Sequence, residues 1–263
     1  MYYFRLIGSF FRASLQDEMA HRSNFWISLL HSTLNLLTGV LGVIVLFDQV
    51  ESINGWDFSS TLAILGVYLT VSALRGLFLG PSLDALAGMD GEVWTGKLDF
   101  TLLRPVDVQF QASFRHWQPL RLLDLSLGLG VLVTAITRLG QSVAFPDLLA
   151  FLVTLLIGML ILYAILLVFA GLVFWSPNFL FTWVFDGIFQ MARYPVGVYP
   201  QWLRLVLTWI IPVGLITTIP AQALSGRLPV SAFGGALLMA FMLLSGGTIV
   251  FRAGLQRYAS ASS

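Results

Sequence analysis

Long apolar stretches alternate with short polar segments along the chain, and this pattern predicts a bundle of membrane-spanning helices. A helix that crosses the hydrocarbon core of a bilayer needs about 20 mostly apolar residues. Stretches of this kind, the fifth of them short, lie at 24–47, 58–79, 119–137, 145–175, 178–192 and 230–251. We therefore expect an all-α integral membrane protein with six transmembrane helices, which form one transmembrane domain over residues 1–263.

The apolar region between the fifth and sixth spans, 193–227, is interrupted by Pro212 and Pro220. Proline removes a backbone donor and kinks or ends a helix. Irregular backbone is tolerated at membrane depth where protein buries it or where it lines a cavity. The two prolines thus predict a re-entrant helical hairpin, which enters the membrane and returns to the same side.

Residues 1–23 show the pattern of an amphipathic helix. Apolar side chains recur at helical spacing at Phe4, Ile7, Phe11 and Leu15. Arg5 and Arg12 recur at the same spacing on another face. A helix with these two faces lies in the membrane surface, so we expect an interfacial helix that contacts membrane lipids.

Composition supports the membrane assignment and excludes several functions. Of the 263 residues, 57% are hydrophobic and 10% are charged, whereas soluble proteins carry about 25% charged residues. The net charge of +1 gives no electrostatic case for nucleic acid. The chain has no cysteine, which excludes disulfides, thiol catalysis and cysteine-ligated zinc.

The distribution of basic residues predicts the orientation. Six spans put both termini on one side, and basic residues concentrate in the segments on that side: 1–23, 80–117 and the segment after 251. The loop between the first two spans, "DQVESINGWD", has three acidic residues and no basic one. Because cytoplasmic loops are enriched in Lys and Arg, we expect both termini to be cytoplasmic.

The cytoplasmic segment 80–117 contains "DGEVWTGKLDF", which matches the phosphate-binding P-loop pattern except at its last position. That position needs Ser or Thr to bind magnesium, and it is Leu98. A P-loop also joins a strand to a helix, and no apolar strand precedes Gly91. We conclude that the match is fortuitous and that this chain binds no ATP through a P-loop.

The same segment has the pattern of a docking element for a partner protein. A short mixed run combines apolar Leu98, Phe100, Leu102 and Leu103 with charged Lys97 and Asp99, and Arg104 and Pro105 end it. Apolar side chains supply affinity at protein interfaces, and flanking charges fix the register. The alternative is a surface helix that touches only lipid headgroups.

The stretch "TGKLDFTLLRPVDVQF" resembles the coupling helix between the second and third spans in membrane subunits of ATP-binding-cassette exporters of the type-2 superfamily. The matching positions are Thr95, Gly96, Leu98, Asp99, Leu102, Leu103, Pro105 and Val106. A second stretch, 194–227, resembles the re-entrant hairpin between the fifth and sixth spans in the viologen-exporter-like branch of that superfamily. The resemblance covers nearly the whole chain.

This resemblance implies a permease subunit of an exporter in the bacterial cytoplasmic (inner) membrane. The expected partners are ABC ATPase subunits, which hold ATP and magnesium on separate chains, and a second permease, a paralogue being favoured over an identical copy. The chain itself would be no enzyme and would hold no cofactor. The candidate ATPase-coupling residues are Thr95, Gly96, Lys97, Leu98, Asp99, Phe100, Leu102, Leu103, Arg104 and Pro105.

Charged residues within the spans are functional candidates by default. Asp186 and Gln190, one turn apart in the fifth span, are candidates for lining the translocation path, and Asp186 has the alternative role of a structural partner for a neighbouring helix or for Arg193. Asp124 is expected to pair with Arg121 three residues earlier. Arg75 is expected to extend to the lipid headgroups, and His31 is expected to be packed and hydrogen-bonded.

The substrate expected on these grounds is a hydrophobic or amphipathic molecule or an organic cation. Two other functions remain open. One is a self-contained secondary transporter, although only one broken helical region is visible where paired ones are typical. The other is a membrane-embedded lipid-modifying enzyme, although the histidines and acids do not follow a metal-ligand spacing.

Overall fold

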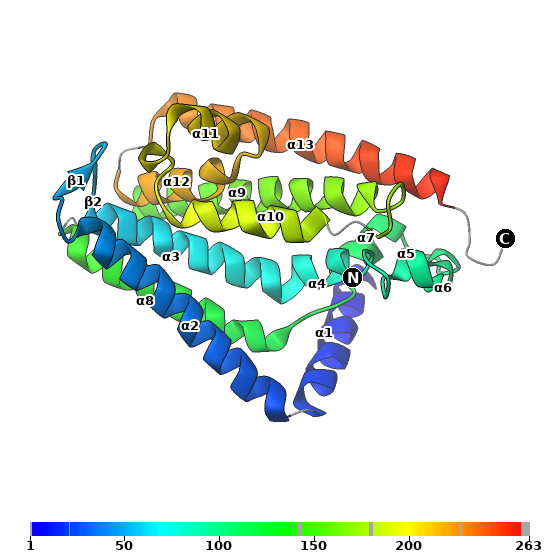
Figure 1. Ribbon diagram of the computed structural model, residues 1–263. Coiled ribbons are helices and arrows are strands. Elements are labelled where there is room, and N and C mark those ends of the chain that lie inside the picture. Colours follow the sequence, from blue (N-terminus) through cyan, green and yellow to red (C-terminus); the bar gives the residue numbers. More distant parts are fainter. Residues whose placement is uncertain (1, 21, 141–143, 179–180, 227, 259–263) are drawn as a thin grey trace.

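A computed structural model of the chain describes residues 2–20, 22–140, 144–178, 181–226 and 228–258 as a helical bundle (Figure 1). Five helical segments of the described part are long and apolar enough to cross a membrane. They are Ser23–Phe47, Phe58–Asp84, Pro119–Leu139, Phe145–Leu172 and Val230–Arg257. These correspond to the first four predicted spans and the sixth, so most of the predicted membrane bundle is confirmed.

The helices of the first half pack around α3 (Phe58–Leu74), which is almost entirely buried. It continues through a π-helical turn, η1 (Arg75–Leu79), into α4 (Gly80–Asp84). Against it lie α2 (Arg22–Phe47) and, most extensively, α8 (Leu122–Leu139), which follows the short η2 (Pro119–Arg121). The second half is built on α9 (Phe145–Leu172), which packs against α12 (Val213–Leu224) and α13 (Val230–Arg257).

The bundle has two different ends (Figure 1). At the loop end lie α5 (Glu92–Thr95), α6 (Leu98–Leu102) and α7 (Val108–Phe114), together with the last turn of α13. At the hairpin end, β1 (Ser52–Ile53) and β2 (Trp56–Asp57) form a two-stranded antiparallel sheet. This sheet corrects the all-helical expectation, and its Asn54-Gly55 turn, with positive φ at both residues, is a preferred hairpin connection.

The predicted fifth span is not one continuous helix. Over 178–192 the structure describes α10 (Phe181–Phe189), followed by a 3₁₀ turn, η3 (Gln190–Arg193). The nine residues of α10 extend only about 14 Å, against about 30 Å of hydrocarbon core. The segment nevertheless connects the two ends, because Pro177 accepts a hydrogen bond from Gly88 at the loop end and Gly197 accepts one from Asn54 at the hairpin end.

The region predicted as a re-entrant hairpin is a pair of helices that meet at a sharp bend. After η4 (Val196–Val198), α11 (Gln201–Leu205) and the π-helical η5 (Val206–Ile210) run into Pro212, and α12 follows at 89°. Pro212 is thus the break, as predicted. Pro220 is not a break, since it lies inside α12, where Thr217 and Ile219 beside it are buried by the surrounding helices.

The amphipathic N-terminal segment forms α1 (Tyr2–Ala20), which runs across the direction of the long helices rather than along it (Figure 1). Its apolar face contacts the loop end, where Tyr3 packs on Phe110 and Phe11 packs on Trp117. The backbone N–H of Trp117 also donates to Ser14, at 3.1 Å. The predicted helix is therefore present. One of its faces packs on the loop end, and other side chains of the helix are exposed.

Candidate functional site

The loop between α4 and α8 is cross-linked internally by a buried carboxylate. Glu92, at the start of α5, is 8% exposed. It forms an ion pair with Arg115 and lies 3.3 Å from Nε2 of His116. Arg115 also donates to the hydroxyl of Thr101 in α6, at 2.7 Å. One buried charge cluster thus joins α5, α6 and the end of α7.

A second set of contacts fixes this loop to the helix that enters it. Ser82 in α4 exchanges hydrogen bonds with the backbone N–H and C=O of His116, at 2.8 and 3.0 Å. The N–H of Gln118 donates to Leu77 in η1 at 2.9 Å. The loop is therefore attached to η1 and α4 on one side and to the start of α8 on the other.

The outer surface of this loop is apolar. Phe100 is 70% exposed and Leu103 is 82% exposed, and Leu102, Trp94 and Met89 are also exposed. Lys97, Arg104 and Pro105 lie exposed beside them. We call Met89, Trp94, Phe100, Leu102 and Leu103 the loop-end apolar surface. Large exposed apolar groups of this kind mark contact surfaces for proteins or lipids.

Leu98 does not belong to this surface, contrary to the expectation from the sequence. It is 1% exposed and lies in the hydrophobic core. The reason is the turn before it: Thr95 ends α5, and Gly96 takes a left-handed conformation with φ of 73°. The chain reverses there, so that Leu98 points inward while Phe100 points outward.

The end of α13 contacts the same loop. The carboxylate of Asp99 in α6 lies beside Tyr258, the residue that follows α13. Burial, and then this carboxylate, raise the pKa of Tyr258 to about 12. Tyr258 therefore stays neutral at physiological pH, and the last turn of α13 is placed next to the α6 helix.

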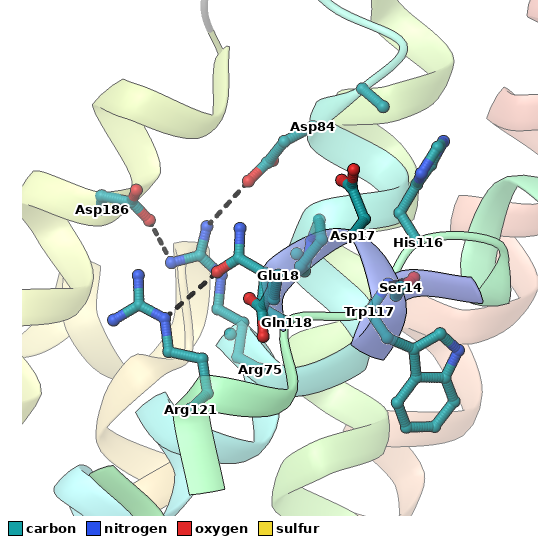
Figure 2. A pocket seen from close by; sticks show the side chains of 14 residues that line it. Ser14, Asp17, Glu18, Arg75, Asp84, His116, Trp117, Gln118, Arg121 and Asp186 are labelled. Atoms are coloured by element: carbon teal, nitrogen blue, oxygen red, sulfur yellow. Dashed lines mark hydrogen bonds and ion pairs between the residues drawn. The ribbon is translucent and has the colours of Figure 1, made fainter. Parts of the chain in front are cut away.

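Arg75 is the charged centre of the bundle (Figure 2). Its guanidinium forms an ion pair with Asp186 of α10, lies 3.8 Å from the carboxylate of Asp84 in α4, and stacks over Phe185. Its side chain is 13% exposed. The expectation that Arg75 extends to the headgroups is therefore wrong, because two carboxylates hold it inside the bundle. For Asp186, the structural partner is Arg75 and not Arg193.

An open cavity of about 570 Å³ lies at the loop end, beside Arg75 (Figure 2). Acidic groups outnumber basic ones in its wall, which includes Asp17, Glu18, Asp84, Asp186, Arg75 and Arg121. Glu18 of α1 accepts the backbone N–H of Leu120 at 2.8 Å. Burial raises the pKa of the Glu18 carboxyl above its ordinary value of 4.5, while the Leu120 N–H and Arg121 act in the opposite direction. We call this the loop-end cavity.

A second cavity of about 260 Å³ lies between α2, the C-terminal part of α3 with η1, and the end of α10. We call it the mid-bundle cavity. Arg75, Gly76, Arg121 and Asp186 line both cavities, so the Arg75–Asp186 ion pair lies where they meet. The mid-bundle cavity is also lined by Gln190, which places both predicted path residues on its wall.

Two further expectations for charged or polar residues of the spans have different outcomes. Arg121 and Asp124 form the expected ion pair within one helix, at 3.0 Å. His31 lines the mid-bundle cavity and is exposed, so the expectation that it is packed and hydrogen-bonded is wrong. Across the described ranges, no group of three His, Cys, Asp or Glu side chains is arranged to hold a metal ion.

Sequence reasoning missed the two ion pairs that organise the site. Glu92 and Arg115 are 23 positions apart, with two short helices between them. Arg75 and Asp186 belong to different halves of the chain. Neither pair has a helical spacing, and the only signal in the sequence is that Arg75 and Asp186 are isolated charges within apolar stretches.

Comparison with known families gives one match. The family model described as ABC-2 family transporter protein matches residues 33–262, which is most of the chain. Comparisons with the curated proteins and with the solved structures found no match. With its long apolar helices and this match, the chain is a multi-pass membrane protein that belongs to the ABC-2 transporter family.

Proposed function

We propose that this chain is the non-catalytic permease subunit of an ATP-driven exporter, and that the loop-end apolar surface docks an ABC ATPase on a separate polypeptide. The observation that carries the proposal is the combination of an apolar surface with a rigid attachment. Phe100 and Leu103 are exposed, while the Glu92–Arg115 ion pair cross-links the loop behind them. Ser82 of α4 attaches the loop to the helices α3 and η1 that α4 continues. A partner that binds this surface acts directly on those helices.

The orientation follows from the same surface. An ATPase is cytoplasmic, so the loop end, with α1 and the last turn of α13, faces the cytoplasm. In this orientation α1 is the interfacial helix, and segment 177–197 is the fifth crossing, in broken form. The chain is at the hairpin end at Gly197, just before α11, and it is there again where α13 begins. Because α11 and α12 lie between these two points, they form a re-entrant hairpin from the outer side.

The translocation path runs through the two cavities. The loop-end cavity is the cytoplasmic entrance, and the mid-bundle cavity, with Gln190 in its wall, is the first chamber inside the membrane. Asp186 controls passage between them through its ion pair with Arg75. This role combines the two expected for Asp186 from the sequence, lining the path and pairing with a neighbouring helix.

A second permease completes the path. In the described part, the long apolar windows of α2 and α13 are each only 17% buried, so broad apolar faces are left for lipid and for another permease. The α13 face with exposed Leu237, Leu238 and Phe241 is the surface we assign to this partner. Family resemblance favours a paralogue over an identical copy.

The test is co-purification from the native membrane in mild detergent. Wild-type chain is expected to bring down an ABC ATPase, and a Phe100→Glu, Leu103→Glu double variant is expected to lose it, because two carboxylates would be buried in an apolar interface. The control is Phe145→Glu, which makes the same replacement of an exposed aromatic residue in the first turn of α9, at the other end of the molecule.

Two results contradict the proposal. If wild-type chain brings down no ATPase, a self-contained secondary carrier becomes the better explanation. If the double variant retains the ATPase, the exporter assignment stands but the docking surface lies elsewhere. A second membrane protein in the wild-type sample would identify the partner permease.

A further inference from the structure

Arg193 is an unneutralised cation at the middle of the bundle. Its guanidinium donates to Asn35 Oδ1 and, at 3.4 Å, to the hydroxyl of Thr38, and it lies 5.1 Å from the ring centroid of Tyr68. All of these partners are uncharged. Within the described ranges, no carboxylate forms an ion pair with Arg193.

The other arginines of this region are neutralised. Arg75 has Asp84 and Asp186, and Arg121 has Asp124. A guanidinium keeps its charge at any physiological pH, and a charge at membrane depth is costly unless it is paired or serves a function. Arg193 therefore has a capacity for a negative partner that the chain does not fill.

The surroundings of Arg193 are suited to an anionic headgroup. Arg193 lines the mid-bundle cavity, and Asn35, Ser72 and Gln190 in the same wall add hydrogen-bonding groups. The cavity volume of about 260 Å³ is below the roughly 300–1,000 Å³ that encloses a whole drug-sized ligand. It is sufficient for a headgroup but not for a long tail.

The tail of such a molecule has an apolar surface beside the cavity. Leu30, Leu34 and Leu37 are exposed on α2, the helix that supplies His31 and Asn35 to the cavity wall. An apolar tail along this face would stay in contact with the bilayer while the headgroup lies in the cavity. The contacts around Arg193 thus match one class of ligand, an amphiphile with an anionic head.

We propose that the mid-bundle cavity binds the phosphate or carboxylate headgroup of an amphiphile, with Arg193 as its counter-ion. As an account of the transported substrate, this rests on the proposed exporter function. As an account of a binding site it does not, because binding is measured on this chain without any ATPase.

The experiment uses the full chain in nanodiscs of phosphatidylcholine and a fluorescent dodecyl phosphate probe, with binding followed by fluorescence anisotropy. Arg193→Gln is expected to raise the Kd at least tenfold, and Arg193→Lys is expected to recover part of the affinity, since it keeps the charge and loses the fork of donors. The matched control is Arg138→Gln, because Arg138 also stacks on an aromatic ring, Phe58 at 5.6 Å, but does not line this cavity.

A trimethylammonium probe with the same tail separates anion recognition from tail binding. Arg193→Gln is expected not to weaken the binding of this cationic probe. If added phosphatidylglycerol displaces the phosphate probe, the source of the anion is a bilayer lipid. If it does not displace the probe, the source is a free amphiphile. Arg193 binds the anion in both cases. Equal affinity of wild type and a folded Arg193→Gln variant for the phosphate probe would overturn the proposal, and so would tighter binding of the cationic probe.

Discussion

Single residues in this molecule matter most where a charge meets a helix junction. Glu18 is the clearest case, because it links α1 to the start of α8 through the Leu120 N–H. Its raised pKa means that the folded chain binds this proton more tightly than the unfolded chain does. The stability that comes from this difference is fully present below the unfolded pKa and is lost as the pH rises through the folded pKa.

We therefore expect wild-type chain to gain stability relative to Glu18→Gln as the pH falls from neutral to about 5. Glutamine keeps an oxygen acceptor for the Leu120 N–H and does not titrate. Asp17 and His116, which line the same cavity, are unchanged between the two proteins, so the difference between the two Tm values isolates Glu18. The measurement is thermal unfolding in detergent at a series of pH values. A difference that is constant with pH would show that burial of Glu18 has no energetic effect.

At the level of elements, close helix packing depends on a few glycines. A Cβ on Gly128 of α8 would lie 2.8 Å from the backbone nitrogen of Thr70 in α3, and one on Gly66 of α3 would lie 2.9 Å from the backbone of Leu132. Small residues at such positions let membrane helices approach closely. Gly130, two residues along α8, has nothing within 4 Å of the same position.

Gly128→Ala is accordingly expected to destabilise the chain by about 1–3 kcal/mol, because two backbones must separate. Gly130→Ala is expected to be neutral or stabilising by up to about 1 kcal/mol, as alanine favours a helix over glycine. Denaturant titration of both variants in mixed micelles compares them directly. If the two variants lose stability equally, helix propensity rather than close approach decides the outcome.

The elements also show what the sequence can predict. The length of the apolar stretches located the first four spans and the sixth, and helical spacing located α1, because both patterns are local. The broken crossing at 178–192 and the continuous helix through Pro220 were not predictable from local pattern. Each depends on partners from elsewhere: Asn54 bonds to Gly197, and α9 packs along α12.

At the scale of the whole molecule, the Arg75–Asp186 ion pair links the two halves of the chain. Arg75 follows α3, which leads into the loop between α4 and α8, and Asp186 lies in α10. The pair is therefore expected to hold α10 in register with the loop. The sequence showed both residues as isolated charges but not as partners, since pairing of distant residues requires the tertiary fold.

Asp186→Asn is expected to broaden the distance distribution between spin labels at Lys97→Cys and Trp183→Cys, because the charge that holds Arg75 to α10 is removed. The natural chain has no cysteine, so the two labels attach only at these exposed positions. Pulsed electron paramagnetic resonance in nanodiscs makes the measurement. Asp124→Asn is the matched control, since it removes a carboxylate that pairs within its own helix. Equal broadening in both variants would contradict a link between the halves.

The short helix α6 has a mechanical consequence. Its five residues carry Leu98 inside the core and Phe100 outside it, with a buried hydroxyl, Thr101, joined to Arg115. An element so short has no length over which to bend. Force applied to its outer side chains is therefore transmitted to the long helices with little loss. The stiffness of the loop between α4 and α8 comes from the burial of this one helical turn and not from its length.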